Sequence, residues 1–158
     1  RRPRIARFGL CFAMVLLLAL PAAEAASRVA VSVGDVNVAV DAGAASDPAT
    51  AELGRTLRVA LSDELSRVTG LGPMKRPLIV SATLTRLSTE RRDERARASA
   101  TISLALRRAD DQVLFAELRG RASAEDAAGN LASLRRAALQ GAVHGALARL
   151  PEVVERTR

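Results

Sequence analysis

The chain has 158 residues, of which 49% are hydrophobic and 2% aromatic, and its 24 basic and 17 acidic residues give a net charge of +7. This length suits one domain with a single hydrophobic core. Residues 1–25 contain four of the arginines and one glutamate, which leaves 20 basic and 16 acidic residues in the remainder. That balance is typical of an ordinary protein surface and argues against nucleic acid as a partner.

The N-terminal segment has the pattern of a secretory signal peptide. Four arginines precede an apolar run over residues 8–20, which Pro21 ends, and Ala23-Glu24-Ala25 supplies a cleavage site of small residues. The run is about 13 residues long, shorter than the roughly 20 of a membrane-spanning helix. We therefore predict a signal peptide over residues 1–25 and one exported domain over residues 26–158, without a transmembrane segment after processing. Cys11 is the only cysteine, so the predicted domain has no thiol for a disulfide, a metal or catalysis.

Valines alternate over residues 29–33 and again, in the opposite phase, over residues 36–40. Gly34-Asp35 lies where the phase changes. Two interpretations fit this pattern, a hairpin with a two-residue turn or one strand with a bulge, and the hairpin is slightly favoured. Further along, Asp47-Pro48 is typical of a helix start, and leucines then recur every fourth residue from Leu53 to Leu65. This spacing predicts an amphipathic helix with one buried face.

Three strands follow. Apolar residues alternate with polar ones from Leu78 to Leu84, from Ala98 to Leu106 and from Leu114 to Ala122, with Leu114 predicted inward and Phe115 outward. The short links between these strands predict antiparallel pairing, and the clean alternation predicts one face open to solvent. A final helix over residues 131–150 opens at Gly129-Asn130, and Pro151 is expected to end its regular part.

Two helices with apolar stripes and one half-apolar sheet have a simple packing solution. We predict an α+β fold, a two-layer sandwich in which a mainly antiparallel sheet of four or five strands carries two helices on one face. The expected order of elements is β(β)αβββα.

The outward face of the sheet is the best candidate for binding. Its guanidinium and hydroxyl groups suit phosphate, carboxylate or sugar groups, and an aromatic ring could anchor a partner, although a plain solvated face is the simpler alternative. The chain has no Tyr or Trp to stack on bases or sugars. The predicted partner-binding residues are Arg97, Arg107, Phe115, Arg119 and Arg121.

Other residues give weaker signals. Gly141 and Gly145 are one helical turn apart, which predicts close packing of that helix or self-association of the chain. His144 is the only histidine and is expected to be a solvated helix residue. Three of the four adjacent acidic pairs, among them Asp110-Asp111, are expected in turns. No catalytic, phosphate-binding or metal-binding signature occurs, so no catalytic residue, metal ligand or cofactor is predicted.

The order of these elements, from the N-terminal segment through the strands over residues 78–122 to the last helix, resembles small bacterial cell-envelope accessory proteins. These include the lipopolysaccharide-assembly lipoprotein, curli-secretion-like and synthase-activator types. The resemblance implies a non-enzymatic domain of the periplasm or envelope that binds another envelope protein or an anionic envelope component. Two alternatives stay open. One is a small hydrolase that uses a serine with His144, and the other is a self-associating structural protein with its seam at Gly141 and Gly145.

Overall fold

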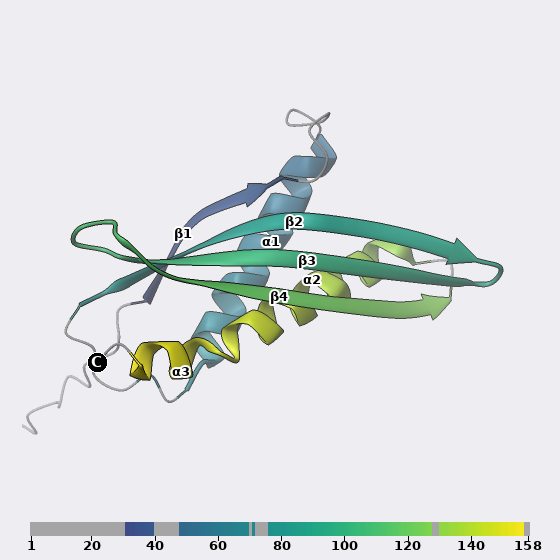
Figure 1. The fold of residues 1–158 in the computed structure, drawn as a ribbon. Helices are drawn as coiled ribbons and strands as arrows, with labels where there is room; N and C mark the ends of the chain where they lie inside the picture. Colours follow the sequence, from purple (N-terminus) through teal and green to yellow (C-terminus); the bar gives the residue numbers. More distant parts are fainter. Residues whose placement is uncertain (1–30, 40–47, 70, 72–75, 128–129, 157–158) are drawn as a thin grey trace, which may run out of the picture.

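The computed structural model describes residues 31–39, 48–69, 71, 76–127 and 130–156 (Figure 1). The signal peptide predicted over residues 1–25 and the predicted helix cap at Asp47 lie outside these residues. The elements are β1 (Val31–Val38), α1 (Pro48–Arg67), β2 (Leu78–Arg92), β3 (Arg95–Arg108), β4 (Leu114–Ala127), α2 (Leu131–Leu147) and α3 (Leu150–Glu155).

The four strands form one mixed sheet in the order β1-β2-β3-β4. β2 pairs antiparallel with β3, and β3 pairs antiparallel with β4, through short connections. β1 instead runs parallel to β2, because the chain passes through helix α1 before it returns to the sheet. Figure 1 shows α1 and α2 on the same side of the sheet. The predicted α+β sandwich is confirmed, with the order βαβββα.

The favoured hairpin near the N-terminus is wrong, and the alternative, a bulged strand, is correct. In β1, Gly34 and Asp35 stand opposite the single residue Ser81, between the pairs Val33–Val80 and Val36–Ala82. The extra residue reverses the phase of the strand, so the valines on both sides of it pack against the hydrophobic core. Glycine suits this bulge, since a Cβ on Gly34 would lie 2.6 Å from Cγ2 of Ile79.

Two further irregularities change which side chains face outward. In β2 the pairing passes from Leu84–Ile102 directly to Arg86–Thr101, which leaves Thr85 as an extra residue. In β4 the pairing passes from Leu106–Ala116 to Arg107–Leu114, which leaves Phe115 as the extra residue. The prediction for the start of β4 is therefore corrected. Leu114 is 56% exposed, and Phe115 is half buried against the core.

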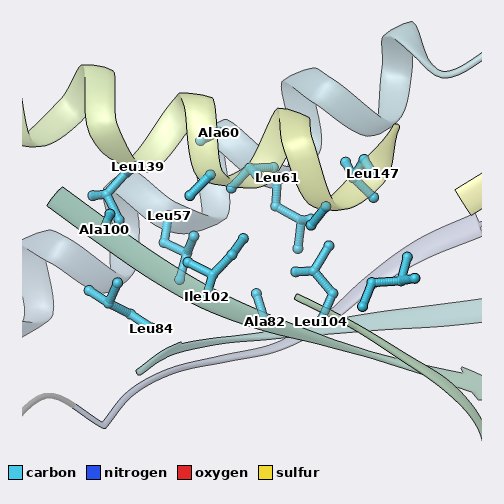
Figure 2. Close-up of a cluster of buried hydrophobic side chains, with 14 of the residues drawn as sticks. Leu57, Ala60, Leu61, Ala82, Leu84, Ala100, Ile102, Leu104, Leu139 and Leu147 are labelled. Atoms are coloured by element: carbon cyan, nitrogen blue, oxygen red, sulfur yellow. The ribbon is translucent and has the colours of Figure 1, made fainter. Parts of the chain in front are cut away.

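The hydrophobic core lies between the helices and the inward face of the sheet. Figure 2 shows Leu57 and Leu61 of α1 and Leu139 of α2 directed at strand residues that include Ile102. All of these side chains are fully buried, and no polar side chain is buried among the described residues. The predicted leucine stripe of α1 is confirmed. The last helix differs from its prediction, because α2 ends at Leu147 and Pro151 lies in the first turn of the short helix α3.

Helix α2 approaches β4 most closely at Gly120. A Cβ at this position would collide with the backbone carbonyl of Ala142 and would come within 3.0 Å of the Cβ of Ala146. Only a glycine lets the helix backbone lie so near the strand. Gly54 on α1 is different, because the nearest atom to its added Cβ is Cγ2 of Val38 at 3.8 Å, an ordinary contact.

We predict that Gly120→Ala destabilises the domain by about 3 kcal/mol, because α2 must move away from the sheet. Gly54→Ala is the matched control. It should stabilise the domain by about 1 kcal/mol, since alanine favours the helix and meets no close neighbour. Chemical denaturation of the two variants measures both effects. Equal stability of the Gly120→Ala protein and the parent chain would contradict the close approach.

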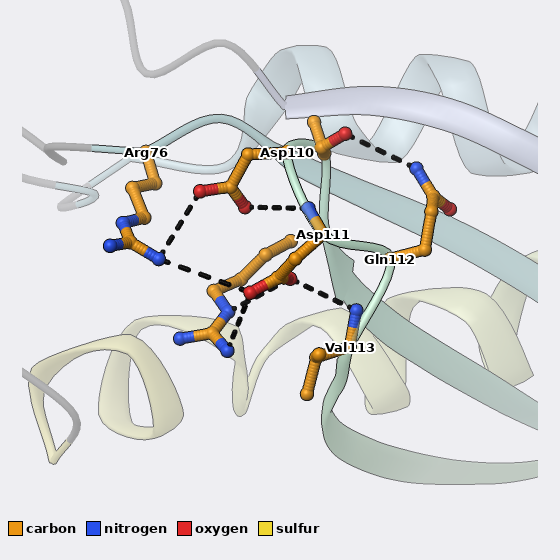
Figure 3. Close-up of polar contacts among 7 residues, drawn as sticks. Arg76, Asp110, Asp111, Gln112 and Val113 are labelled. Carbon is orange, nitrogen blue, oxygen red and sulfur yellow. Dashed lines mark hydrogen bonds and ion pairs between the residues drawn. The ribbon is translucent and has the colours of Figure 1, made fainter.

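The β3–β4 turn is held by the predicted acidic pair (Figure 3). The Val113 backbone N–H donates to Oδ1 of Asp111 at 3.0 Å, and Arg108 forms an ion pair with Oδ2 of Asp111 at 2.8 Å. Arg76 forms an ion pair with Asp110 at 3.2 Å. The hydrogen bond from Val113, followed by the charge of Arg108, lowers the pKa of Asp111 below its ordinary value of 3.8.

A carboxyl group whose pKa is lower in the folded state stabilises the fold above its unfolded pKa. This stabilisation is lost as the pH falls through the lower, folded pKa. We therefore expect Asp111→Asn to lower the Tm at pH 7, and we expect the difference from the parent chain to shrink as the pH falls below about 4. Thermal unfolding followed by circular dichroism between pH 2 and pH 7 tests this expectation. A difference that does not vary with pH would show that the charge of Asp111 adds nothing.

Candidate functional site

The face of the sheet opposite the helices is the candidate site. We call it the outward face, and it consists of the β2–β4 residues that alternate with the buried ones, paired across the strands. Arg97, Arg107, Arg119 and Arg121 all lie on it and are exposed, as predicted. Phe115 does not, because the bulge in β4 turns its side chain toward the core.

The register of the strands places arginines and hydroxyls of this face in three adjacent rows. In an antiparallel pair, residues directly opposite each other point to the same face of the sheet. Two of the rows contain arginine and are Arg86–Thr101–Arg121 and Thr83–Ser103–Arg119. The third row, Ser88–Ser99–Ser123, contains serine alone.

Arg86 is a member of this face that the sequence pattern does not identify. A strict period of two from Leu84 places Arg86 inward, with the core residues. The extra residue Thr85 reverses the phase, so Arg86 pairs with Thr101 on the outward face, and Leu87 packs inward instead. Thr85 reinforces this arrangement, because its hydroxyl donates to the carbonyl of Thr101 at 3.0 Å. In the sequence, the only signal for this outward position is an arginine where the period of two predicts a buried side chain.

The arginines of the outward face differ in their local charge. Arg97 pairs across the strands with two carboxylates, Glu90 and Glu125, and donates to Oγ of Ser123 at 3.2 Å. Arg119 forms an ion pair with Oε1 of Glu117 at 3.2 Å. The charge of Arg119 is therefore partly neutralised inside the face, whereas Arg97 has two carboxylates opposite it in the register but forms no ion pair with a described residue.

Glu117 accepts hydrogen bonds from two residues of the outward face. The hydroxyl of Ser103 donates to Oε1 of Glu117 at 2.8 Å, and this bond, with that from Arg119, lowers the pKa of Glu117 below its ordinary value. No described carboxylate forms an ion pair with Arg86, Arg107 or Arg121, and none lies opposite these exposed arginines in the strand register. The five predicted residues thus divide into two arginines with a carboxylate beside them, Arg97 and Arg119, two arginines without one, Arg107 and Arg121, and Phe115, which packs against the core.

Gly141 and Gly145 also differ from each other. A Cβ on Gly141 would lie 2.9 Å from the Cβ of Ala122, so this glycine lies close to β4. A Cβ on Gly145 would meet no described atom within 4 Å, and the residue is exposed. Packing inside the domain therefore accounts for Gly141 and does not account for Gly145.

We expect Gly141→Leu to destabilise the domain by about 2 kcal/mol through overpacking against Ala122. Gly145→Ala should instead stabilise it by about 1 kcal/mol through helix propensity. Thermal unfolding, together with sedimentation at several concentrations, measures both stability and association. A Gly145→Ala protein that is less stable or associates less than the parent chain would place Gly145 in a contact between copies.

His144 lies on the helix layer, away from the outward face. It is 73% exposed, in agreement with its predicted solvated position, and its Nδ1 lies 3.0 Å from Oε2 of Glu64 on α1. The shallow groove beside this pair encloses about 340 Å³. Its lining includes one hydroxyl residue, Thr69, and no serine, so the predicted serine–histidine pair is not assembled there. No cluster of three or more metal-ligating side chains occurs in the described residues.

Comparison with known proteins shows which solved structures have a similar fold. No protein-family model matches the sequence, and no curated protein matches it. Among solved structures, a DUF330-family protein from Xanthomonas campestris is 13% identical with a TM-score of 0.52, covering 80% of this chain and 86% of its own. A PelC dodecamer from Paraburkholderia phytofirmans is 10% identical with a TM-score of 0.50, covering 80% and 90%.

A minor lipoprotein from Acinetobacter baumannii is 8% identical with a TM-score of 0.39, covering 78% of this chain and 92% of its own. Within the residues that the structure describes, no helix combines the length and apolar character required to span a bilayer. At identities this low, structural likeness establishes the fold alone. The chain therefore shares its architecture with the DUF330 protein and PelC.

Proposed function

We propose that this protein is a non-enzymatic accessory domain, exported to the periplasm or cell envelope of a bacterium. It binds another envelope protein or an anionic envelope component through the outward face. The observation that carries this proposal is an open sheet face rich in arginine and hydroxyl groups, which no described helix covers. The signal-peptide pattern over residues 1–25 supports the export, and the fold is one that the DUF330 protein and the PelC dodecamer share.

The chemistry of the outward face suits an anionic ligand. Guanidinium groups bind carboxylates and phosphates through paired N–H donors, and such charge-assisted hydrogen bonds are stronger than neutral ones. The serine and threonine hydroxyls between the arginines both donate and accept. In the His144 groove, by contrast, the guanidinium of Arg67 donates to the carboxylate of Glu64, which also lies 3.0 Å from Nδ1 of His144.

Self-association is a second candidate function, and two observations favour it. One structural neighbour, PelC, is a dodecamer. Among the described residues, β1 and β4 each pair with a strand on one side only, so the sheet has two edges that could accept a strand of another copy. Copies joined edge to edge would still present the outward face to a partner.

We expect cross-linking of a C-terminally tagged chain in cells, followed by mass spectrometry, to capture one dominant envelope protein on a chain processed near Ala26. Replacement of Arg97, Arg107, Arg119 and Arg121 by serine should abolish most of that adduct, because it removes the cationic donors of the face. We call this protein the four-arginine variant. Its circular dichroism and Tm serve as folding controls.

Three results would contradict the proposal. An unprocessed chain in the cytoplasm would contradict the proposed export to the periplasm or cell envelope. An adduct that forms equally well with the four-arginine variant would place the binding surface elsewhere. Adducts between copies of this chain alone, with concentration-dependent sedimentation, would favour the self-associating structural protein.

A further inference from the structure

We infer that the row Arg86–Thr101–Arg121 is the anion-binding centre of the outward face, and that its ligand is an anionic polysaccharide. This inference rests on the proposed function, since it identifies the chemistry that the outward face would recognise. The row consists of one hydroxyl between two open guanidinium groups. Each member comes from a different strand of the sheet.

The local charge of the row is the first argument. Neighbouring strands are about 4.8 Å apart, so Arg86 and Arg121 originate about 10 Å from each other on either side of Thr101. Neither arginine forms an ion pair with a described residue, and the residue opposite both is the neutral Thr101, whereas the residues opposite Arg97 are the carboxylates Glu90 and Glu125. The Arg86–Arg121 pair is therefore an uncompensated positive site that an oxyanion would neutralise.

The surroundings of the row are the second argument. On one side lies Ser88–Ser99–Ser123, and on the other lies Thr83–Ser103–Arg119. Successive outward residues on a strand are about 7 Å apart, so the three rows cover about 14 Å along the strands. A surface of hydroxyls around a charged centre matches a sugar chain, whose own hydroxyls need donors and acceptors and whose carboxylate or sulfate groups need cations.

The same surroundings argue against a lipid bilayer as the ligand. A membrane-binding surface combines basic residues with apolar side chains that enter the bilayer. The exposed large hydrophobic residues of the described chain are Val59 on α1 and Val113 and Leu114 at the β3–β4 turn. Leu114 pairs with Arg107, several residues along β3 from Thr101, so none of the three adjoins the row.

The way in which the ligand is held follows from the composition. The chain contains no Tyr or Trp, and Phe115 packs against the core, so stacking on sugar rings does not contribute. Binding then depends on charge and hydrogen bonds. We therefore expect the affinity to fall steeply as the salt concentration rises, because salt screens exposed charges.

The test uses the purified processed chain with polygalacturonate as the anionic probe and dextran as the neutral one, in low salt. We expect the parent chain to bind polygalacturonate and not dextran. The double variant Arg86→Gln, Arg121→Gln should bind polygalacturonate at least about tenfold more weakly. The matched control is the double variant Arg55→Gln, Arg58→Gln, which removes the same number of charges from exposed positions of helix α1 and should change the affinity less than about twofold. An unchanged Tm shows that each variant is folded.

Each other result overturns the inference in a distinct way. Equal losses in the α1 control and in the Arg86→Gln, Arg121→Gln variant would show attraction by net charge alone. Undiminished binding by the double variant would move the site away from this row. Binding to phosphatidylglycerol vesicles, without binding to polygalacturonate, would make the ligand a membrane.

A final comparison separates this inference from the proposed function. If the double variant keeps its affinity for polygalacturonate while the four-arginine variant loses its adduct in cells, the outward face binds a protein. The proposed function then stands, and the polysaccharide site is wrong. If the four-arginine variant keeps its adduct in cells, the proposed use of the face is wrong as well.

Discussion

The contact between helix α2 and strand β4 at Gly120 is the constraint on which the rest of the structure depends. The carbonyl of Ala142 occupies the space that any side chain at Gly120 would need. At this contact the helix presents the small side chains of Ala142 and Ala146 to the strand, while larger buried residues of α2, such as Leu139, pack elsewhere in the core. The close packing commits α2 to one face, so the other face of the sheet remains open.

Three strand irregularities then decide what that open face displays. The extra residue in β1 keeps both groups of valines on the core. The extra residue in β2 carries Arg86 outward, and that in β4 carries Phe115 inward. Bulges commonly redirect side chains in this way near functional surfaces. Without them, the outward face would hold an aromatic ring in place of one of its open arginines.

The residues that stabilise the fold and the residues that we propose bind a ligand therefore lie on opposite faces of the sheet. The helices and the inward face of the sheet supply a dry core of aliphatic side chains, in which no described polar group is buried. The outward face contributes little to that core, so its charges are free to serve a ligand. Its arginines are not equivalent, because the neighbouring strands place carboxylates opposite Arg97, Glu117 of the same strand forms an ion pair with Arg119, and only a hydroxyl lies opposite Arg121.

The sequence by itself determined the helices, the strands β2 to β4 and the two-layer α+β architecture, because side-chain periodicity is a local property of the chain. The leucine stripe of α1 and the alternation in β3 could be read directly, and so could the exposed arginines at 97, 107, 119 and 121. Only the tertiary structure decided the parallel placement of β1, the outward position of Arg86, the inward position of Phe115 and the different environments of Gly120, Gly141 and Gly145. Those features depend on pairing between residues distant in sequence, where one extra residue on a strand reverses every side chain beyond it.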